Sequence, residues 1–420
     1  AGDALTTGLD NVAIGYNTMS TADGSEARNV AVGTHALASM NTDGNNYNTA
    51  VGYAAGTSIT TGVINTLIGG LAGDAITTGS GNTAVGYQAL TTEDANGTTT
   101  AIGQKALMLQ NAGTESYNTA VGYDAGQQVT TGNENTLIGG RAGEALTTGG
   151  GNVALGKSAL ADETTGGNNV AIGKDSMSSS QLSQNNVAVG IQTLQNVTNA
   201  SLKNTYNVAV GAYAGNDVTT GERNILIGGF AGDTLTTGAD NVAIGYNAIG
   251  GVTTGSYNIA IGRHTGNVLT SGNSQVLIGY EAGDALTTGS RNVAIGHQAL
   301  SAEDEHGRNV AIGYAALKVQ DAGANAYNIA VGYNAGAAVS TGVFNTIIGG
   351  LAADSLTDGT GNIVVGYHAG RSLTSGSSNV AIGYLALNSE DAHGRNIAIG
   401  QQALEELNAG ANGNNIAIGY

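Results

Sequence analysis

Asn11-Val12-Ala13-Ile14-Gly15 opens a pattern that Asn415-Ile416-Ala417-Ile418-Gly419 closes. The chain repeats this phrase in 24 copies: asparagine, an aliphatic residue or threonine, usually alanine, an aliphatic residue and glycine. Most copies are 17 residues apart, and the longest interval, Gly190 to Gly211, has 21 residues. Self-similarity at a short fixed period is the signature of a solenoid. The pattern therefore predicts an all-β fold, a parallel β-solenoid (β-roll or β-helix) of about 24 coils with a mostly 17-residue period.

The glycine that ends each copy, here called the core glycine, follows a strand that is apolar on both faces. The residues one and three places before it are Ile, Val, Leu or Thr in all 24 copies, and the residue between them is mostly Ala. Side chains alternate along a strand, so the large and the small residues lie on opposite faces. One face fills the coil, and the other must meet a second sheet or another chain. We assign the alanine face to contact between chains, so that Ala243→Glu should disrupt assembly.

The residues after the core glycine show two kinds of compensation in volume. Four places after it stands either a large residue such as Leu107 or a glycine such as Gly126, which is followed three places later by Val129. One large side chain per coil is thus supplied from either position, as close packing requires. Leu67 enlarges the usual alanine where Gly70 replaces the common tyrosine, but Leu277 breaks this rule. With Thr-Thr-Gly corners, we expect two short strands and two bends per coil.

Composition limits the class of protein. No shift in composition divides the 420 residues, so we expect one continuous domain over residues 1–420, a segment of a longer fibre protein. With 41% hydrophobic and 10% charged residues, the chain is a poor candidate for disorder. The net charge of -18 argues against a nucleic-acid partner, and no apolar run is long enough to insert into a membrane.

The asparagine that opens each copy is present in 22 of 24 copies, with Thr99 and Gln275 as the exceptions. Stacked amides at equivalent corners are predicted to form a hydrogen-bonded ladder along the coils. The alternative is a polar binding stripe, but such strict regularity is what packing requires. The residues assigned to this structural ladder, with their core glycines, are Asn11, Asn29, Asn48, Asn65, Asn82, Asn118, Asn135, Gly15, Gly33, Gly52, Gly69 and Gly86.

Residues with catalytic or metal-binding chemistry give no site in the sequence. The six histidines occupy unrelated repeat positions without a ligand spacing. Acidic pairs recur after Ala-Leu and are interpreted as exposed, solvated loops, with acid–base glycan hydrolysis as the alternative. The aspartate of Ala-Gly-Asp is a weak calcium candidate. We therefore predict no catalytic, cofactor-binding or metal-binding residues, and no enzyme. The acidic groups concerned are Glu93-Asp94, Glu303-Asp304, Glu390-Asp391, Asp74, Asp233 and Asp284.

Eleven tyrosines directly follow a core glycine. Repeated tyrosines suit packing at the surface or at a subunit seam, and they can also stack on sugar rings. The candidates for surface or glycan contact are Tyr16, Tyr53, Tyr87, Tyr123, Tyr246 and Tyr333. Threonine ranks on solenoids can bind ice, but alternation along a strand predicts one outward threonine per Thr-Thr pair and no double rank.

The stretch Asn11 to Met19, Asn-Val-Ala-Ile-Gly-Tyr-Asn-Thr-Met, resembles the head repeats of trimeric autotransporter adhesins, a motif that also occurs in phage tail fibres. The resemblance covers essentially the whole chain and implies a left-handed parallel β-roll and an obligate homotrimer forming a rod. The period is longer than in adhesin heads. Larger phrases recur 70 residues apart, at Tyr47 and Tyr117 and at Asn65 and Asn135, which is closer to the tail-fibre version.

These observations predict a structural or adhesive fibre shaft, foremost of a phage tail or receptor-binding fibre. A bacterial surface trimeric adhesin or extracellular filament is the alternative, and a fibre-borne polysaccharide depolymerase is less favoured. The expected partners are further copies of the chain and a cell-surface glycan or protein receptor. The expected location is extracellular, on a virion tail fibre or the bacterial cell surface.

Overall fold

The computed structural model describes residues 1–2, 5–251, 254–408, 410 and 413–420. These residues form β-strands, turns and bends without any helix. Their three-residue strands recur with the spacing of the glycine pattern, which confirms the predicted parallel β-solenoid of about 24 turns. Internal contacts divide the chain into two compact units, Ala1–Asn207 and Val208–Tyr420, built from the same coil.

The first unit contributes 11 strands to the parallel ladder in its described part, one per coil. They are β1 (Val12–Ile14), β3 (Val30–Val32), β5 (Thr49–Val51), β6 (Thr66–Ile68), β7 (Thr83–Val85), β8 (Thr100–Ile102), β9 (Thr119–Val121), β10 (Thr136–Ile138), β11 (Val153–Leu155), β12 (Val170–Ile172) and β14 (Val187–Val189).

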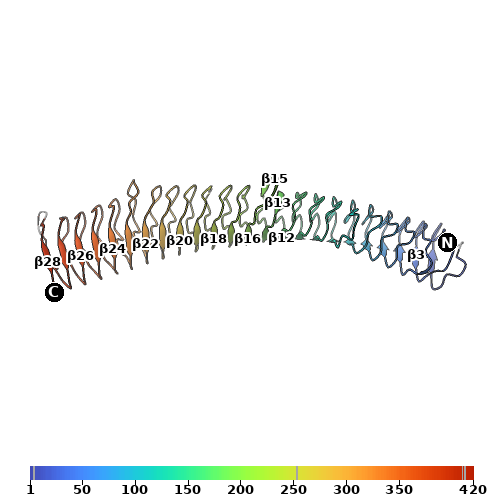
Figure 1. The fold of residues 1–420 in the computed structure, drawn as a ribbon, viewed down its shortest axis with the longest axis horizontal. Helices are drawn as coiled ribbons and strands as arrows, with labels where there is room; N and C mark the ends of the chain where they lie inside the picture. Colours follow the sequence, from blue (N-terminus) through green and yellow to red (C-terminus); the bar gives the residue numbers. More distant parts are fainter. Residues whose placement is uncertain (3–4, 252–253, 409, 411–412) are drawn as a thin grey trace. The chain divides into compact units, whose positions relative to one another are not determined.

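Two short parallel pairs stand apart from this ladder. They join β2 (Glu26–Ala27) to β4 (Gly44–Asn45) and β13 (Gln181–Gln184) to β15 (Thr198–Asn204). The β13–β15 pair uses the extra residues of the 21-residue interval and lies on the side of its coils away from the ladder strands (Figure 1).

The described residues of the second unit contribute 13 strands to the parallel ladder. They are β16 (Val208–Val210), β17 (Ile225–Ile227), β18 (Val242–Ile244), β19 (Ile259–Ile261), β20 (Val276–Ile278), β21 (Val293–Ile295), β22 (Val310–Ile312), β23 (Ile329–Val331), β24 (Thr346–Ile348), β25 (Ile363–Val365), β26 (Val380–Ile382), β27 (Ile397–Ile399) and β28 (Ile416–Ile418).

Neighbouring coils pair their strands in parallel and in the register that the repeat dictates. Val242, Ala243 and Ile244 of β18 lie opposite Ile259, Ala260 and Ile261 of β19. Insertions leave the register unchanged, since β22 and β23 pair across a 19-residue interval with alanine opposite alanine. The extra residues therefore lie in the turns, and the strand face keeps its order from coil to coil.

Each coil has one main strand, so the prediction of two strands per coil is wrong. The turn that follows the core glycine contains residues at positive φ, for example Lys105 at 56° and Leu107 at 47°. Such left-handed residues break an extended segment and reverse its direction. Threonine and alanine patterning in this segment reflects a packed turn rather than a second strand.

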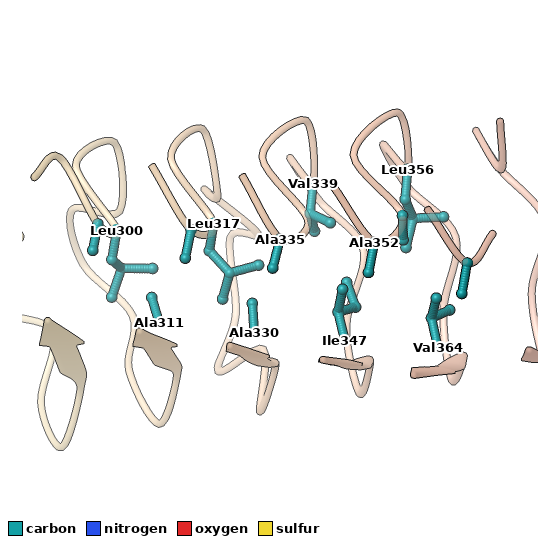
Figure 2. Close-up of a cluster of buried hydrophobic side chains, with 14 of the residues drawn as sticks. Leu300, Ala311, Leu317, Ala330, Ala335, Val339, Ile347, Ala352, Leu356 and Val364 are labelled. Carbon is teal, nitrogen blue, oxygen red and sulfur yellow. The ribbon is translucent and has the colours of Figure 1, made fainter. Parts of the chain in front are cut away.

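The interior of each coil is filled by the middle residue of the strand and by one large residue from the turn. Figure 2 shows Leu300 and Leu317 entering from one turn position and Val339 from the other, above the strand residues Ala311 and Ala330. All five are fully buried. This confirms the prediction that each coil takes one large side chain from either of two turn positions.

The enlarged strand residues are accommodated inside the coil, which corrects the pairing of Leu67 with Gly70. Leu277 lies between Gly266 and Gly283, where an added Cβ would come within 2.9 Å of Leu277 Cδ1 and Cδ2, respectively. Leu67 has the same relation to two turn glycines. Leu277 therefore follows the rule once the compensating glycine is sought on the interior side.

The core glycines stack directly on one another. Gly69 has a φ of 135°, and a Cβ there would lie 2.5 Å from the carbonyl oxygen of Gly86 in the next coil. Both the conformation and the contact with backbone exclude a side chain. This is why glycine occupies the position in every copy.

Candidate functional site

The outer strand face consists of the first and third residues of each ladder strand, and it is the uncovered apolar surface of the coils. In the second unit it is almost entirely aliphatic, and Ile227 and Ile363 keep 38% and 44% of their surface exposed. The first residue of the strand is threonine from β5 to β10, so the first unit presents a more polar version.

The alanine face lies in the interior of the coil, so its assignment to contact between chains is wrong. Ala243 and Ala260 are fully buried within a single chain. A coil of about 17 residues encloses little volume, and the interior already holds a large turn residue. In most coils a small residue therefore fits beside it, a larger one such as Leu67 being accommodated next to turn glycines, and the other aliphatic residues of the strand are placed outside.

The asparagines form a hydrogen-bonded ladder at the corner before each strand. Oδ1 of Asn135 accepts the backbone N–H of Asn152 in the next coil at 3.0 Å, and its Nδ2 donates to the carbonyl of Gly149 at 3.0 Å. These side chains are buried, except that Asn11 in the first coil and Asn415 in the last are half-buried. Gln275 keeps the same two contacts, donating to Gly289 and accepting from Asn292. The amides that could have formed a polar binding stripe are therefore used in hydrogen bonds between coils.

The tyrosines that follow core glycines lie on the surface. In the second unit, Tyr280, His297, Tyr314 and Tyr333 form a continuous aromatic rank, with ring centroids 5.0, 5.1 and 5.2 Å apart and planes within 25° of each other. This spacing is close to the distance between coils. Rings stacked in this way cover each other's faces and present edges to solvent, whereas a sugar stacks on an exposed face.

The six tyrosines proposed for surface or glycan contact are all exposed. Tyr246 meets Phe230 and His264 edge-on, and Tyr16 and Tyr53 both contact His35 edge-on. Tyr333 instead belongs to the stacked rank. Contact of the six tyrosines with a glycan remains a prediction.

In most Thr-Thr-Gly corners the second threonine is exposed and the first is half-buried, as Thr148 and Thr147 are, which agrees with one outward threonine per pair. Thr60 and Thr61 are an exception, since both are exposed. The first hydroxyl of each pair donates to the next coil, as Thr147 does to the carbonyl of Thr164 at 2.9 Å. The inner rank therefore holds coils together.

The first acid of each Glu-Asp pair is fully buried, which corrects their interpretation as exposed loops. Glu93, Glu303 and Glu390 stand seven residues after a core glycine, where other coils place an aliphatic residue, and their side chains point inward. Glu163 occupies the same position and is also fully buried. The glutamates differ in how their carboxylates are satisfied.

Glu303 lies in a group that we call the Glu303 cluster: Glu303, Asp304, His306 and Asp321. One ligand atom of each lies within 4.8 Å of all the others. The pKa of Glu303 is raised to about 7, chiefly by burial; the backbone N–H of His306 lowers it, and the nearby Asp321 and Asp304 contribute to the rise. Glu390, Asp391 and His393 form a matching group of three.

His306 and His393 occupy equivalent positions, so the histidines are not scattered over unrelated ones. Each stands ten residues after its core glycine and three after the buried glutamate. Counting from the core glycine, rather than looking for two histidines close in sequence, reveals this group.

The aspartates of Ala-Gly-Asp are half-buried and have one oxygen without a hydrogen bond. This applies to Oδ1 of Asp74, Asp233 and Asp284. Burial raises the pKa of all three carboxyls. They occupy the same position of the turn in separate coils, without other acids near enough to form a metal-binding group among the described residues.

Comparisons with known proteins give no family. No protein-family model matches the chain, and no curated protein is significantly similar to it. In the described part of the chain, no helix is long and apolar enough to cross a membrane. The surfaces above are therefore the basis for the functional argument.

Proposed function

We propose that this chain is a structural segment of an extracellular fibre, in which several copies associate through the outer strand face. The observation that carries the proposal is the aliphatic surface repeated at the same place in successive coils of the second unit. Ile225, Ile227 and Ile259 are each more than one-third exposed in the single chain. Burying a half-exposed side chain of this size stabilises an interface by about 1 kcal/mol.

The number of copies that best covers such a face is three, as in the adhesin repeats that the sequence resembles. Light scattering on the purified chain should give three times the 41.4 kDa chain mass. Ile225→Glu with Ile227→Glu, which change one coil of this face, should raise the concentration below which the assembly dissociates into single chains, without loss of strand signal in circular dichroism. Thr220→Glu, at an exposed corner, is the matched control and should leave the trimer intact. A monodisperse wild-type monomer contradicts the proposal.

The leading function is the shaft of a phage tail or receptor-binding fibre, supported by the uninterrupted repeat and its grouping in units of 70 residues. A bacterial surface adhesin or extracellular filament is the second candidate, because the adhesin repeats share the same phrase. Immunogold electron microscopy on the native source separates them. Gold on fibres that project from virions supports the first, whereas gold on cell envelopes or free filaments supports the second.

The chain is proposed to have no enzymatic activity. A fibre-borne depolymerase needs two carboxyl groups that flank a glycosidic bond at the surface. The recurrent acidic pairs do not meet this need, because Glu93, Glu303 and Glu390 are directed into the coil. Release of oligosaccharide from capsular glycan incubated with the pure chain would overturn this part of the proposal.

A further inference from the structure

The Glu303 cluster joins two neighbouring coils of the second unit. Glu303, Asp304 and His306 come from the turn after Gly296, and Asp321 comes from the turn after Gly313. Asp304 and Asp321 are eight residues after their core glycines, so parallel stacking places one beside the other. Glu303 is fully buried, Asp304 and His306 are half-buried, and Asp321 is exposed.

The buried carboxylate of Glu303 has few donors compared with its counterparts. Glu163 accepts four backbone N–H groups and the hydroxyl of Ser183, at 2.7 to 3.1 Å. Glu93 accepts the backbone N–H and side-chain amide of Asn96 and the amide of Gln110. These glutamates are satisfied by the protein alone, as buried charge requires.

Glu303 receives one backbone N–H, from His306 at 3.1 Å, and a long contact of 3.4 Å from Nδ2 of Asn309. His306 replaces the asparagine of the Glu93 coil, but its ring does not complete the same set of bonds. Its Nδ1 is 3.7 Å from Oε1 of Glu303, beyond hydrogen-bond distance. This nitrogen is itself buried and has no hydrogen-bond partner.

We propose that Glu303, Asp304, His306 and Asp321 bind a divalent metal ion of the zinc class, which fastens two successive coils together. The four ligand atoms already lie within 4.8 Å of one another. A tetrahedral zinc site has metal–ligand distances of about 2.1 Å, so its ligand atoms are about 3.4 Å apart. The ligands must approach by about 1 Å, which the half-buried or exposed positions of Asp304, His306 and Asp321 allow; Oδ1 of Asp304 also accepts the backbone N–H of Glu305.

The donor set selects the kind of ion. One imidazole with carboxylates suits zinc and similar transition metals, whereas calcium takes six to eight oxygen ligands, more than this group offers. Three carboxylates and a neutral imidazole carry a formal charge of -3. A divalent cation compensates most of it and supplies the positive partner that the buried Glu303 lacks.

The chain contains its own partial copies of this site. The group of Glu390, Asp391 and His393 has Asn408 where the Glu303 cluster has Asp321, and Nδ1 of His393 is 3.2 Å from Glu390 Oε1. With one ligand fewer and its histidine already bonded, it should bind the metal more weakly. The Glu93 coil, with Asn96 in place of histidine, should not bind it.

The test is calorimetric titration of the full chain with zinc, in excess calcium to occupy general acidic sites. Wild type should show one tight site, and His306→Asn should weaken it at least tenfold. The coil should tolerate asparagine at position 306, because Asn96 occupies the equivalent position in the Glu93 coil. Asp321→Asn, which copies Asn408, is a second variant at an exposed position and should weaken zinc binding to the same extent. His297→Asn, in the aromatic rank, is the matched histidine control and should bind as wild type.

Cobalt gives a second readout that does not depend on stability. A four-coordinate cobalt site absorbs strongly in the visible range, and this absorption should be present in wild type and lost in His306→Asn. Absence of tight zinc binding, or equal binding by wild type and His306→Asn, overturns the proposal. It does not depend on the fibre function, since it is measured on the purified chain whether or not the copies associate.

Discussion

Leu67 occupies the space that a side chain at Gly73 would need. A Cβ at Gly73 would lie 2.8 Å from Cδ2 of Leu67, and a Cβ at Gly56, in the preceding coil, would lie 2.6 Å from its Cδ1. The two glycines and the leucine therefore form one packing unit across two coils. The same relation recurs at Leu137 and Leu277, which makes it a rule of this fold.

Gly73→Ala should therefore lower the free energy of unfolding by about 2 kcal/mol, from overpacking and from the positive φ of 58°. Leu67→Ala alone should cost about 2 to 5 kcal/mol. The double variant should cost less than the sum, because alanine at 67 removes the clash with Leu67 and leaves only that with Cδ1 of Ile76, at 2.8 Å. Denaturant unfolding, with hydrogen exchange to locate the affected coils, provides the measurement.

Gly113→Ala separates the two causes. Gly113 also has a positive φ, 68°, but a Cβ there would meet nothing within 4 Å. It should show only the smaller conformational cost, and Leu67→Ala should not compensate it. Equal effects of Gly73→Ala and Gly113→Ala, with additive double variants, would contradict the packing unit.

Neighbouring residues of β18 should respond in opposite ways to the same charge. Ala243→Glu places a carboxylate in the closed interior and should unfold the surrounding coils. Ile244→Glu places it on the outer strand face, so the coil should remain folded and only association should be weakened. Hydrogen exchange and light scattering on both variants test this. If Ala243→Glu abolished association and left hydrogen exchange unchanged, the alanine face would be the one in contact between chains.

The architecture is predictable because each coil repeats one pattern. Which face of the strand points into the coil is not predictable from that pattern. Alternation shows that Val242 and Ile244 share a face opposite Ala243, without showing which face is enclosed. The volume of the closed coil decides that, and it depends on how sharply the turn closes. The turn after the core glycine could not be told from a second strand, because leucine does not ordinarily mark a positive φ, as it does at Leu107.

The Glu303 cluster was missed for a different reason. Its members are separated in sequence by up to 18 residues, whereas a metal-ligand motif is recognised by short spacings within one segment. Their positions relative to the core glycines Gly296 and Gly313 contain the necessary information, because parallel register places equal positions side by side. In a solenoid, distance from the repeat's fixed residue predicts proximity better than distance along the chain.

Removal of one amide from the asparagine ladder should have a local and sizeable effect. Asn135→Ala leaves the backbone N–H of Asn152 and the carbonyl of Gly149 without partners in a buried corner. Each buried unsatisfied group costs about 1 to 3 kcal/mol, so we expect a loss of about 2 to 4 kcal/mol. Asn135→Gln is the control, because Gln275 makes both contacts in another coil, and it should cost less. Equal losses would show that the amide's hydrogen bonds are not the cause.

The half-buried aspartates should make stability fall as pH rises. Burial raises the pKa of Asp284, so the folded chain binds this proton more tightly than the unfolded chain. The resulting stabilisation is present below the ordinary pKa of about 4 and is lost as pH rises through the folded value. Asp284→Asn, which copies Asn267 in the preceding coil, should raise the thermal midpoint at neutral pH. The gain should vanish below about pH 3, where the aspartic acid of the wild type is protonated and residue 284 is uncharged in both proteins.

Asp43 provides the opposite sign within the same chain. Hydrogen bonds from the backbone N–H and hydroxyl of Ser25 lower its pKa. Its contribution is therefore present above the ordinary pKa and is lost as pH falls through the folded value. Asp43→Asn should lower the midpoint slightly at neutral pH and have no effect in acid. Because a change in net charge alone would shift both variants in the same direction, opposite shifts at neutral pH identify burial as the cause for Asp284.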